Sequence, residues 1–269
     1  MARVKKVRLD DLLVGLGYFP DRDRALRAVM ARKVRVDDVY VSSAALMVAP
    51  DADIFVKGSK RFVSRGGRKL QGALDAFALD VTGRRCVDIG SSTGGFTDCL
   101  LQAGAADVAC VDVNYGQLAW SLRQDPRVRV FERTNIKTAD PEALGAPFDV
   151  LVADLSFIGL SGLAGTFASL CAAGSILIAL IKPQFESAHE ETDRGVVRDP
   201  SVRARVVDEV SCALAAAGFC VQGVVESPIK GPEGNVEYLV KATFAGAVRC
   251  EAGFATHGCS DGREGAGAI

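Results

Sequence analysis

The fold of this chain is decided by one glycine-rich stretch, Asp88-Ile89-Gly90-Ser91-Ser92-Thr93-Gly94-Gly95-Phe96-Thr97. A short apolar run over residues 86–89 leads into it, and a helical pattern over residues 96–101 follows. A strand, a glycine turn and a helix in this order place a ligand at the carboxyl end of a parallel sheet. The spacing is Asp-x-Gly-x-x-x-Gly-Gly and not the Gly-x-Gly-x-x-Gly that holds a pyrophosphate. We therefore expect a nucleotide-like ligand without a pyrophosphate.

From about residue 70 the chain alternates apolar strands with helical patterns. Strands are expected at residues 86–89, 108–113, 128–131, 150–154, 175–182, 220–229 and 236–244, and a long helix at 200–217. Alternating elements with apolar strands imply a mostly parallel sheet covered by helices on both faces. Because no helix separates the last two strands, they are expected to pair antiparallel. The predicted fold class is α/β, a Rossmann-like domain with a seven-stranded, mostly parallel sheet whose last strand is antiparallel.

Acidic residues beside the glycines suit S-adenosylmethionine, which carries cationic groups and has no pyrophosphate. Asp88 is expected to face its ammonium, directly or through water, and Asp112 to accept hydrogen bonds from its ribose hydroxyls. Structural alternatives are that Asp88 caps a helix and that Asp112 merely ends a strand. The residues predicted to bind the cofactor are Asp88, Gly90, Ser91, Ser92, Thr93, Gly94, Gly95, Phe96, Asp112, Val113, Asn135 and Asp154.

Four charged residues stand at or beside the ends of predicted strands. Asp154 and Lys182 close apolar strands, Glu237 opens the last strand, and Lys69 ends a basic segment before the sheet. Neighbouring parallel strands bring their carboxyl ends to one crevice, so these side chains are expected to converge. Each residue taken singly is also compatible with a surface charge or an ion pair. The glycine turn in the same sheet favours a reaction centre.

The N-terminal part of the chain is basic, although the whole chain has a net charge of −1. Residues 1–70 hold 16 Lys and Arg against 8 Asp and Glu. This asymmetry favours contact with a polyanion over a merely solvated surface. Residues 7–48 predict two helices, the second capped by Asp21 or Asp23, and a strand pair at 34–36 and 39–41.

Composition also bounds the organisation of the chain. We expect a basic module over residues 1–57, a basic linker over 58–69 with a sharp turn at Gly66-Gly67, a larger α/β domain over 70–247 and a disordered tail over 248–269. The sequence has no C-x-x-C pair and no histidine at metal spacing, which predicts no metal site. A basic start without an apolar stretch predicts no secretory signal and hence a cytoplasmic protein without a membrane span.

The N-terminal part resembles an RNA-binding module shared by a small-subunit ribosomal protein, bacterial tyrosyl-tRNA synthetase and several pseudouridine synthases. The resemblance rests on Val7-Arg8-Leu9-Asp10, Leu12-Leu13, Arg24-Ala25 and Lys33-Val34-Arg35-Val36-Asp37. It implies two helices packed on a small sheet, with basic side chains facing folded RNA; Asp37-Asp38 departs from it, since the family often has a glycine there. With the basic linker, the residues expected to bind RNA are Arg8, Arg22, Arg24, Arg27, Lys33, Lys60, Arg61, Arg65 and Arg68.

Residues 3–245 resemble TlyA-type proteins, in which this module is joined to an FtsJ/RrmJ-like ribose methyltransferase. The matching phrases are Ser64-Arg65-Gly66-Gly67-Arg68-Lys69-Leu70, Tyr115-Gly116-Gln117-Leu118-Ala119-Trp120, Ala153-Asp154-Leu155-Ser156-Phe157, Lys182-Pro183-Gln184-Phe185-Glu186 and Gly234-Asn235-Val236-Glu237-Tyr238, together with the glycine turn. A departure is Arg61-Phe62-Val63, where relatives have Arg-x-Trp-Val; it bears on signalling between the domains.

The resemblance implies S-adenosylmethionine-dependent methylation of ribose 2′-hydroxyls, of cytidine, in 16S or 23S ribosomal RNA or both, within assembled 30S or 50S subunits. It also implies a catalytic tetrad of Lys69, Asp154, Lys182 and Glu237. Lys182 is then expected to act on the hydroxyl, either as a base or by orienting a lone pair toward the methyl group.

Three other functions fit the sequence less well. A base methyltransferase commonly has Asn/Asp-Pro-Pro-Tyr after the fourth strand, where this chain has Asp154-Leu155-Ser156-Phe157. A membrane-damaging protein, suggested by the hemolysin label of the family, needs an amphipathic or spanning segment, and none is evident. A ribosome-binding protein without activity would not need the intact turn and tetrad. The modified nucleotide, the choice of subunit and the oligomeric state stay open.

Overall fold

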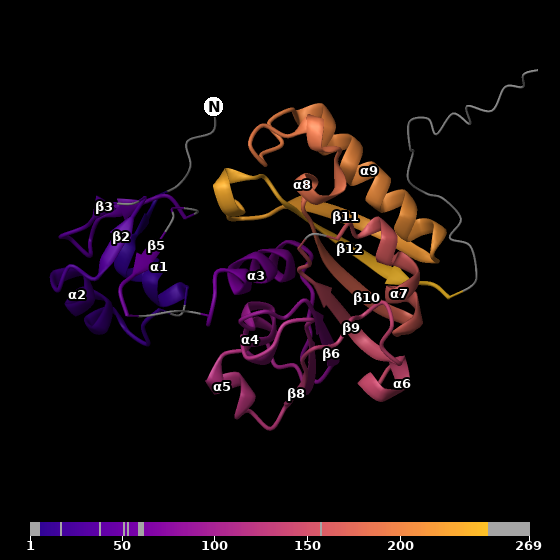
Figure 1. Ribbon diagram of the computed structural model, residues 1–269. Coiled ribbons are helices and arrows are strands. Elements are labelled where there is room, and N and C mark those ends of the chain that lie inside the picture. Colours follow the sequence, from indigo (N-terminus) through magenta and orange to yellow (C-terminus); the bar gives the residue numbers. More distant parts are fainter. Residues whose placement is uncertain are drawn as a thin grey trace, which may run out of the picture. The chain divides into compact units, whose positions relative to one another are not determined.

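Figure 1 shows the computed structural model of the chain, which describes residues 6–16, 18–37, 39–50, 52, 54–58, 62–156 and 158–246. Two of the residues predicted to bind RNA, Lys60 and Arg61, and the predicted tail over 248–269 lie outside the described residues. The chain divides into two compact units. The first unit comprises residues 1–135 with 227–229, and the second comprises residues 136–226 with 230–269.

The N-terminal part of the first unit is a small α/β arrangement. Its elements are β1 (Val7–Arg8), α1 (Leu9–Gly15), α2 (Arg22–Met30), β2 (Val34–Val36), β3 (Val39–Tyr40), β4 (Met47–Val48) and β5 (Ile54–Val56). Strands β3, β2 and β5 form an antiparallel sheet in that order, and β1 pairs with β4. The Asp21 carboxylate accepts a hydrogen bond from the Arg24 amide at 2.7 Å, so Asp21 and not Asp23 caps α2.

Alternation along β2 and β5 builds the core of this part. Val34, Val36, Ile54 and Val56 are buried in a cluster with apolar side chains of both helices, namely Leu9, Leu13, Ala25, Ala28 and Val29. Arg35 points to the other face, where its guanidinium lies 4.3 Å from the centre of the Phe55 ring and 5.7 Å from that of Tyr40. The predicted strand pair and the two helices are confirmed.

The remainder of the first unit contains α3 (Gly66–Ala76), β6 (Arg85–Ile89), α4 (Gly95–Gln102), β7 (Asp107–Val111), α5 (Trp120–Arg123) and β8 (Val128–Phe131). Strands β6, β7 and β8 are parallel neighbours, α4 packs against β6 and β7, and α3 packs against α4. The sharp turn expected at Gly66-Gly67 is wrong, because both glycines lie in the first turn of α3. A Cβ on Gly67 would lie 2.3 Å from Cγ of Phe62, so close packing explains that glycine.

The second unit contains α6 (Pro141–Leu144), β9 (Phe148–Ala153), η1 (Ser161–Leu163), α7 (Ala164–Ser169), β10 (Cys171–Ile181), α8 (Pro183–Glu186), η2 (His189–Glu191), α9 (Pro200–Ala216), β11 (Phe219–Glu226), η3 (Pro232–Gly234) and β12 (Tyr238–Phe244). Helix α9 packs along β11 and β12 (Figure 1) through Val206, Val210 and Leu214, which are spaced for one helical face. The Asp199 side chain caps α9 by accepting from the Ser201 amide at 2.8 Å.

The main sheet has seven strands in the order β11-β12-β10-β9-β6-β7-β8. Strand β10 runs parallel to β9, whereas β12 pairs antiparallel with both β10 and β11. The predicted seven-stranded, mostly parallel sheet with an antiparallel last strand is therefore confirmed.

Candidate active site

The glycine turn lies between the end of β6 and the start of α4. Asp88, fully buried, accepts hydrogen bonds at Oδ2 from the Thr97 amide (2.9 Å) and the Thr97 hydroxyl (2.6 Å). These bonds tie the strand to the first turn of the helix across the glycines, which satisfies one of the orphan amides at the helix start. Asp88 thus fixes the turn from inside, as the capping alternative predicted.

Two glycines of the turn have no room for a side chain. Gly94 has a φ of 91°, and a Cβ there would lie 2.3 Å from Cδ1 of Leu122. A Cβ on Gly95 would lie 2.2 Å from Oγ of Ser64. The turn is therefore pressed against neighbouring segments, while the side chains of Ser92 and Thr93 are exposed. A ligand can approach the backbone at this exposed part of the turn.

Asp112 follows β7 and lies beside the turn. Its Oδ2 accepts a hydrogen bond from the Ser92 amide at 2.7 Å, and its Oδ1 accepts one from the Asn114 amide at 2.8 Å. Two backbone donors orient the carboxylate, and each oxygen retains a lone pair for a further donor. Such a group suits a ribose diol. Val113 and Asn135, both predicted to bind the cofactor, are exposed.

The loop after Asp112 is clamped by residues that the sequence did not single out. Gln117 accepts a hydrogen bond at 3.2 Å from the Ser92 hydroxyl of the turn. Glu132, after β8, accepts one from the Gly116 amide at 2.8 Å and forms an ion pair with Arg123. Glu132 could have been singled out because it is a charged residue directly after an apolar strand. Its partners, Gly116 and Arg123, could not be predicted from the sequence pattern.

The charged cluster of the second unit is built on the adjacent ends of β9 and β10. Nζ of Lys182 lies 2.6 Å from Oδ1 of Asp154 and donates a hydrogen bond to Oγ of Ser156 at 3.0 Å. The Lys182 side chain is 9% exposed and that of Asp154 is 22% exposed. The cluster therefore presents a nearly buried ammonium at the carboxyl ends of parallel strands.

Glu237 joins this cluster through the register of the sheet. Ile181 and Tyr238 are the last pair of the antiparallel β10–β12 ladder, so Lys182 and Glu237 each stand one residue beyond it. Residues opposite each other in such a ladder project to the same face. A Cβ on Gly231 would lie 2.2 Å from Oε1 of Glu237, so only glycine leaves room for this carboxylate.

Asn235 fixes the loop that precedes Glu237. Its Oδ1 accepts a hydrogen bond from the Val197 amide at 3.2 Å, and its Nδ2 donates to the Gly195 carbonyl at 2.9 Å. Its own carbonyl accepts from the Gly231 amide at 2.9 Å. The buried amide thus ties two loops of the second unit together. Lys69, the fourth member of the predicted tetrad, belongs to α3 in the first unit and is also buried.

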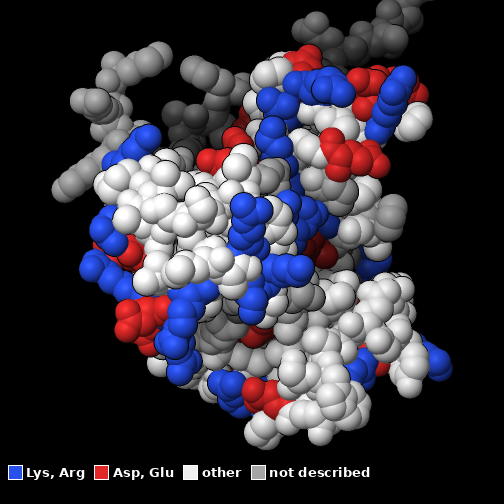
Figure 2. Space-filling view, turned by 90° about the vertical axis from the view of Figure 1, so that its left-hand side faces the viewer, with Lys and Arg blue, Asp and Glu red and all other residues white. Residues whose placement is uncertain are grey.

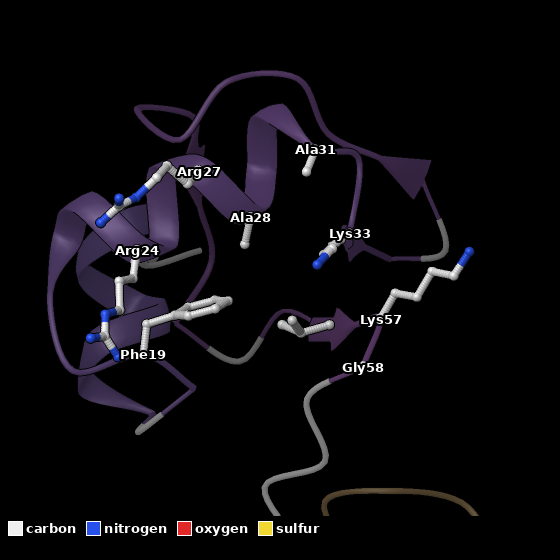
Figure 3. Close-up of a pocket in the computed structure, with 9 residues that line it drawn as sticks. Phe19, Arg24, Arg27, Ala28, Ala31, Lys33, Lys57 and Gly58 are labelled. Carbon is white, nitrogen blue, oxygen red and sulfur yellow. The ribbon is translucent and has the colours of Figure 1, made fainter.

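The basic residues of the N-terminal part fall into two groups. Arg8 pairs with Asp10, and its hydrogen bond lowers the pKa of the Asp10 carboxyl, while Arg22 pairs with Asp11. A second group lines a pocket of about 410 Å³, which Figure 3 shows between α2 and β5; its lining includes Phe19, Arg24, Arg27, Lys33 and Lys57. Arg24, Arg27 and Lys33 were predicted, whereas Phe19 and Lys57 were missed.

Of the linker residues that were predicted to bind RNA, Arg65 is exposed and Arg68 is half-buried on α3.

Within the described residues the chain has neither a metal-binding cluster nor a membrane-spanning helix. No group of His, Cys, Asp and Glu in that part of the chain is arranged to hold a metal ion. No helix there has the length and apolar character needed to cross a bilayer.

A strand, a tight glycine turn, an acid after the next strand and an antiparallel last strand define a Rossmann-like methyltransferase. The chain belongs to the FtsJ-like methyltransferase family, whose model matches residues 62–244. The donor substrate of this class is S-adenosylmethionine, as the sequence predicted.

Relatives extend the match to most of the chain. A protein of Mycobacterium tuberculosis named 16S/23S rRNA (cytidine-2′-O)-methyltransferase TlyA is 45% identical over 239 residues, which cover 88% of this chain and 89% of that protein. Hemolysin A of Brachyspira hyodysenteriae is 36% identical over 235 residues, covering 87% and 98%. A solved structure from Streptococcus thermophilus, provisionally named a hemolysin, is 38% identical with a TM-score of 0.69 and covers 90% of each chain. The resemblance to TlyA-type proteins is confirmed.

Proposed function

We propose that this chain transfers a methyl group from S-adenosylmethionine to a ribose 2′-hydroxyl of ribosomal RNA. The acceptor is cytidine in 16S or 23S RNA, or in both, within assembled ribosomal subunits in the cytoplasm. The observation that carries the proposal is the Lys182 ammonium held between Asp154 and Ser156 at the strand ends of an FtsJ-like domain. Residues 1–57 are the RNA-binding module, 58–69 the linker and 70–247 the methyltransferase domain.

The first unit supplies the residues that would hold the cofactor. Asp112 would accept hydrogen bonds from its ribose hydroxyls, and the backbone from Gly90 to Gly95 would lie against its amino-acid part. Asp88 fixes that backbone through Thr97, and Phe96 is buried under the turn. Val113 and Asn135 would flank the adenine. When bound, the cofactor supplies an electrophilic methyl group on a sulfonium.

The second unit supplies the residues that act on the hydroxyl. As the new oxygen–carbon bond forms and the sulfur–carbon bond breaks, the hydroxyl loses its proton, either to Lys182 or to water. Lys182 either accepts that proton or donates a hydrogen bond that points an oxygen lone pair at the methyl carbon. Asp154 holds the ammonium and would also contact the cofactor, and Glu237 lies beside Lys182 in the register. We assign Lys69 to the same reaction centre from the family motif.

The basic pocket of the N-terminal part is proposed to hold RNA phosphates. Arginine forks suit phosphate because they give two hydrogen bonds and stay charged. Arg24, Arg27 and Lys33 line this pocket together with Lys57 (Figure 3). Figure 2 shows Lys and Arg side chains gathered in the middle of the face that it displays. Lys60, Arg61, Arg65 and Arg68 are proposed to continue the RNA contact.

The test is a transfer assay with labelled S-adenosylmethionine and intact 30S and 50S subunits. We expect label in the RNA of at least one subunit, and which subunit is labelled decides the substrate. Binding to subunits without any label would contradict the proposal and favour a ribosome-binding protein. Label in protein would contradict it as well.

A further inference from the structure

Ser156 is a polar residue of the charged cluster for which the sequence predicted no role. It lies in the segment 154–160, which joins β9 to η1. Its hydroxyl oxygen accepts a hydrogen bond from Nζ of Lys182 at 3.0 Å. Ser156 is exposed, whereas Lys182 is nearly buried. Ser156 therefore belongs to the exposed part of the cluster.

The Lys182 ammonium has three N–H donors. Nζ forms an ion pair with Oδ1 of Asp154 at 2.6 Å, and one N–H is donated to Ser156. Two partners in fixed places set the direction of the third N–H, whereas one partner would let the ammonium rotate about a single axis. We propose that Ser156 is a positioning residue, which fixes the Lys182 ammonium for its action on the acceptor hydroxyl. This inference rests on the proposed function.

The segment that carries Ser156 is fixed at its other end as well. Glu186, the last residue of α8, accepts hydrogen bonds from the Leu160 amide at 2.5 Å and the Ser161 hydroxyl at 3.0 Å. A Cβ on Gly159 would lie 2.8 Å from Oε2 of Glu186, so glycine is required for this approach. Lys182 directly precedes α8 and Glu186 ends it. Residues at the two ends of α8 thus hold the segment at Ser156 and again at Leu160.

Positioning matters here because a lysine side chain is flexible and its charge is compact. Loss of the Ser156 hydroxyl would leave Asp154 as the fixed partner of Nζ, and the third N–H would lose its direction. A hydrogen bond to a charged group is among the stronger ones, so we expect kcat to fall about tenfold to hundredfold. The affinity for cofactor and for RNA should stay unchanged, because the hydrogen bond that the substitution removes is the one to Lys182.

The experiment compares Ser156→Ala with Ser156→Thr, which keeps the hydroxyl, using the ribosomal subunit that the wild-type enzyme methylates. Ser169→Ala is the matched control, since its hydroxyl donates to the Thr166 carbonyl within α7. We measure kcat and KM for the subunit, and cofactor affinity by calorimetry. Thermal unfolding shows that each variant is folded.

We expect Ser156→Ala to lower kcat with KM and cofactor affinity within about twofold of wild type. Ser156→Thr should recover most of the activity, and Ser169→Ala should behave as wild type. An unchanged kcat in Ser156→Ala would overturn the inference, as would a folded Ser156→Thr that is equally impaired. A wild-type enzyme that methylates no ribose would instead refute the proposed function.

Discussion

The Lys182 ammonium and the Asp154 carboxylate lie 2.6 Å apart, each just beyond the end of one of two adjacent parallel strands. The two residues lie close together because β9 and β10 are parallel neighbours, and each residue follows the carboxyl end of its strand directly. This contact fixes where the ammonium lies, and both the orienting role and the base role of Lys182 require that fixed position. Catalysis at this centre then depends on geometry, and the residues around the pair become testable.

Asp112→Asn should weaken cofactor binding about tenfold to hundredfold, because hydrogen bonds to a charged acceptor are lost. The substitution also turns one oxygen into an NH₂ group that faces the amide of Ser92 or Asn114. Isothermal titration with S-adenosylmethionine measures the effect. The matched control is Asp107→Asn at the other end of β7, where the carboxylate pairs with Arg129 at 2.8 Å. Equal losses in both variants would contradict the role of Asp112.

Gly94→Ala should lower the free energy of unfolding by about 2–4 kcal/mol, since left-handed strain and overpacking add. The strain comes from the φ of 91° and the overpacking from the side chain of Leu122. Gly116→Ala is the control, because Gly116 has a φ of 74° with open space around its Cβ position. It should cost about 1 kcal/mol. Urea unfolding distinguishes the two, and equal costs would show that packing against Leu122 is unimportant.

The double variant Arg27→Gln with Lys33→Gln should weaken binding to ribosomal RNA and flatten its salt dependence. Each phosphate interaction that the substitutions remove should lower the slope of log K against log salt by about 0.7–0.9. The control is Arg8→Gln with Arg22→Gln, since these arginines already pair with Asp10 and Asp11. Filter binding at several salt concentrations measures both. A larger effect in the control pair would move the RNA contact from the pocket to the surface at Arg8 and Arg22.

Burial raises the pKa of the Glu186 carboxyl above its ordinary value. The folded protein therefore holds this proton more tightly than the unfolded chain does, and ionisation favours unfolding. The stabilisation that the neutral Glu186 carboxyl gives the folded state is fully present below the pKa of the unfolded chain. It is lost as the pH rises through the raised pKa of the folded state. Compared with Glu186→Gln, the wild type should lose stability over that window. Melting temperatures from pH 4 to pH 8 test this, and a wild type that instead gains stability relative to the variant would contradict it.

The sequence predicted the sheet well because each buried parallel strand is a short apolar run that stands out from its surroundings. It also placed Asp112, Asp154 and Lys182 at strand ends, and in the structure each directly follows its strand. Helix α3 was missed because a Gly-Gly pair in a basic segment is typical of a turn. The glycine at 67 instead accommodates the Phe62 ring.

The supporting side chains could not be predicted. Ser156 and Lys182 are 26 residues apart in the chain, as are Leu160 and Glu186. Such pairs depend on how two distant segments lie after folding, and the hydrophobic periodicity of the sequence does not predict this. The grouping of Lys57 and Phe19 with the predicted arginines also depends on the fold of the small sheet.

The most direct test of a ribose methyltransferase is the chemical identity of its product. Ribosomal subunits are methylated by the wild-type protein, their RNA is digested to nucleosides, and these are identified by mass spectrometry, in parallel with Lys182→Met and with Lys137→Met as an exposed lysine control. We predict 2′-O-methylcytidine from the wild type and the control, and at least a hundredfold less, on the order of a lost positioned catalytic group, from Lys182→Met with cofactor binding retained. A methyl group on a base, or wild-type methylation by Lys182→Met, would contradict the central claim.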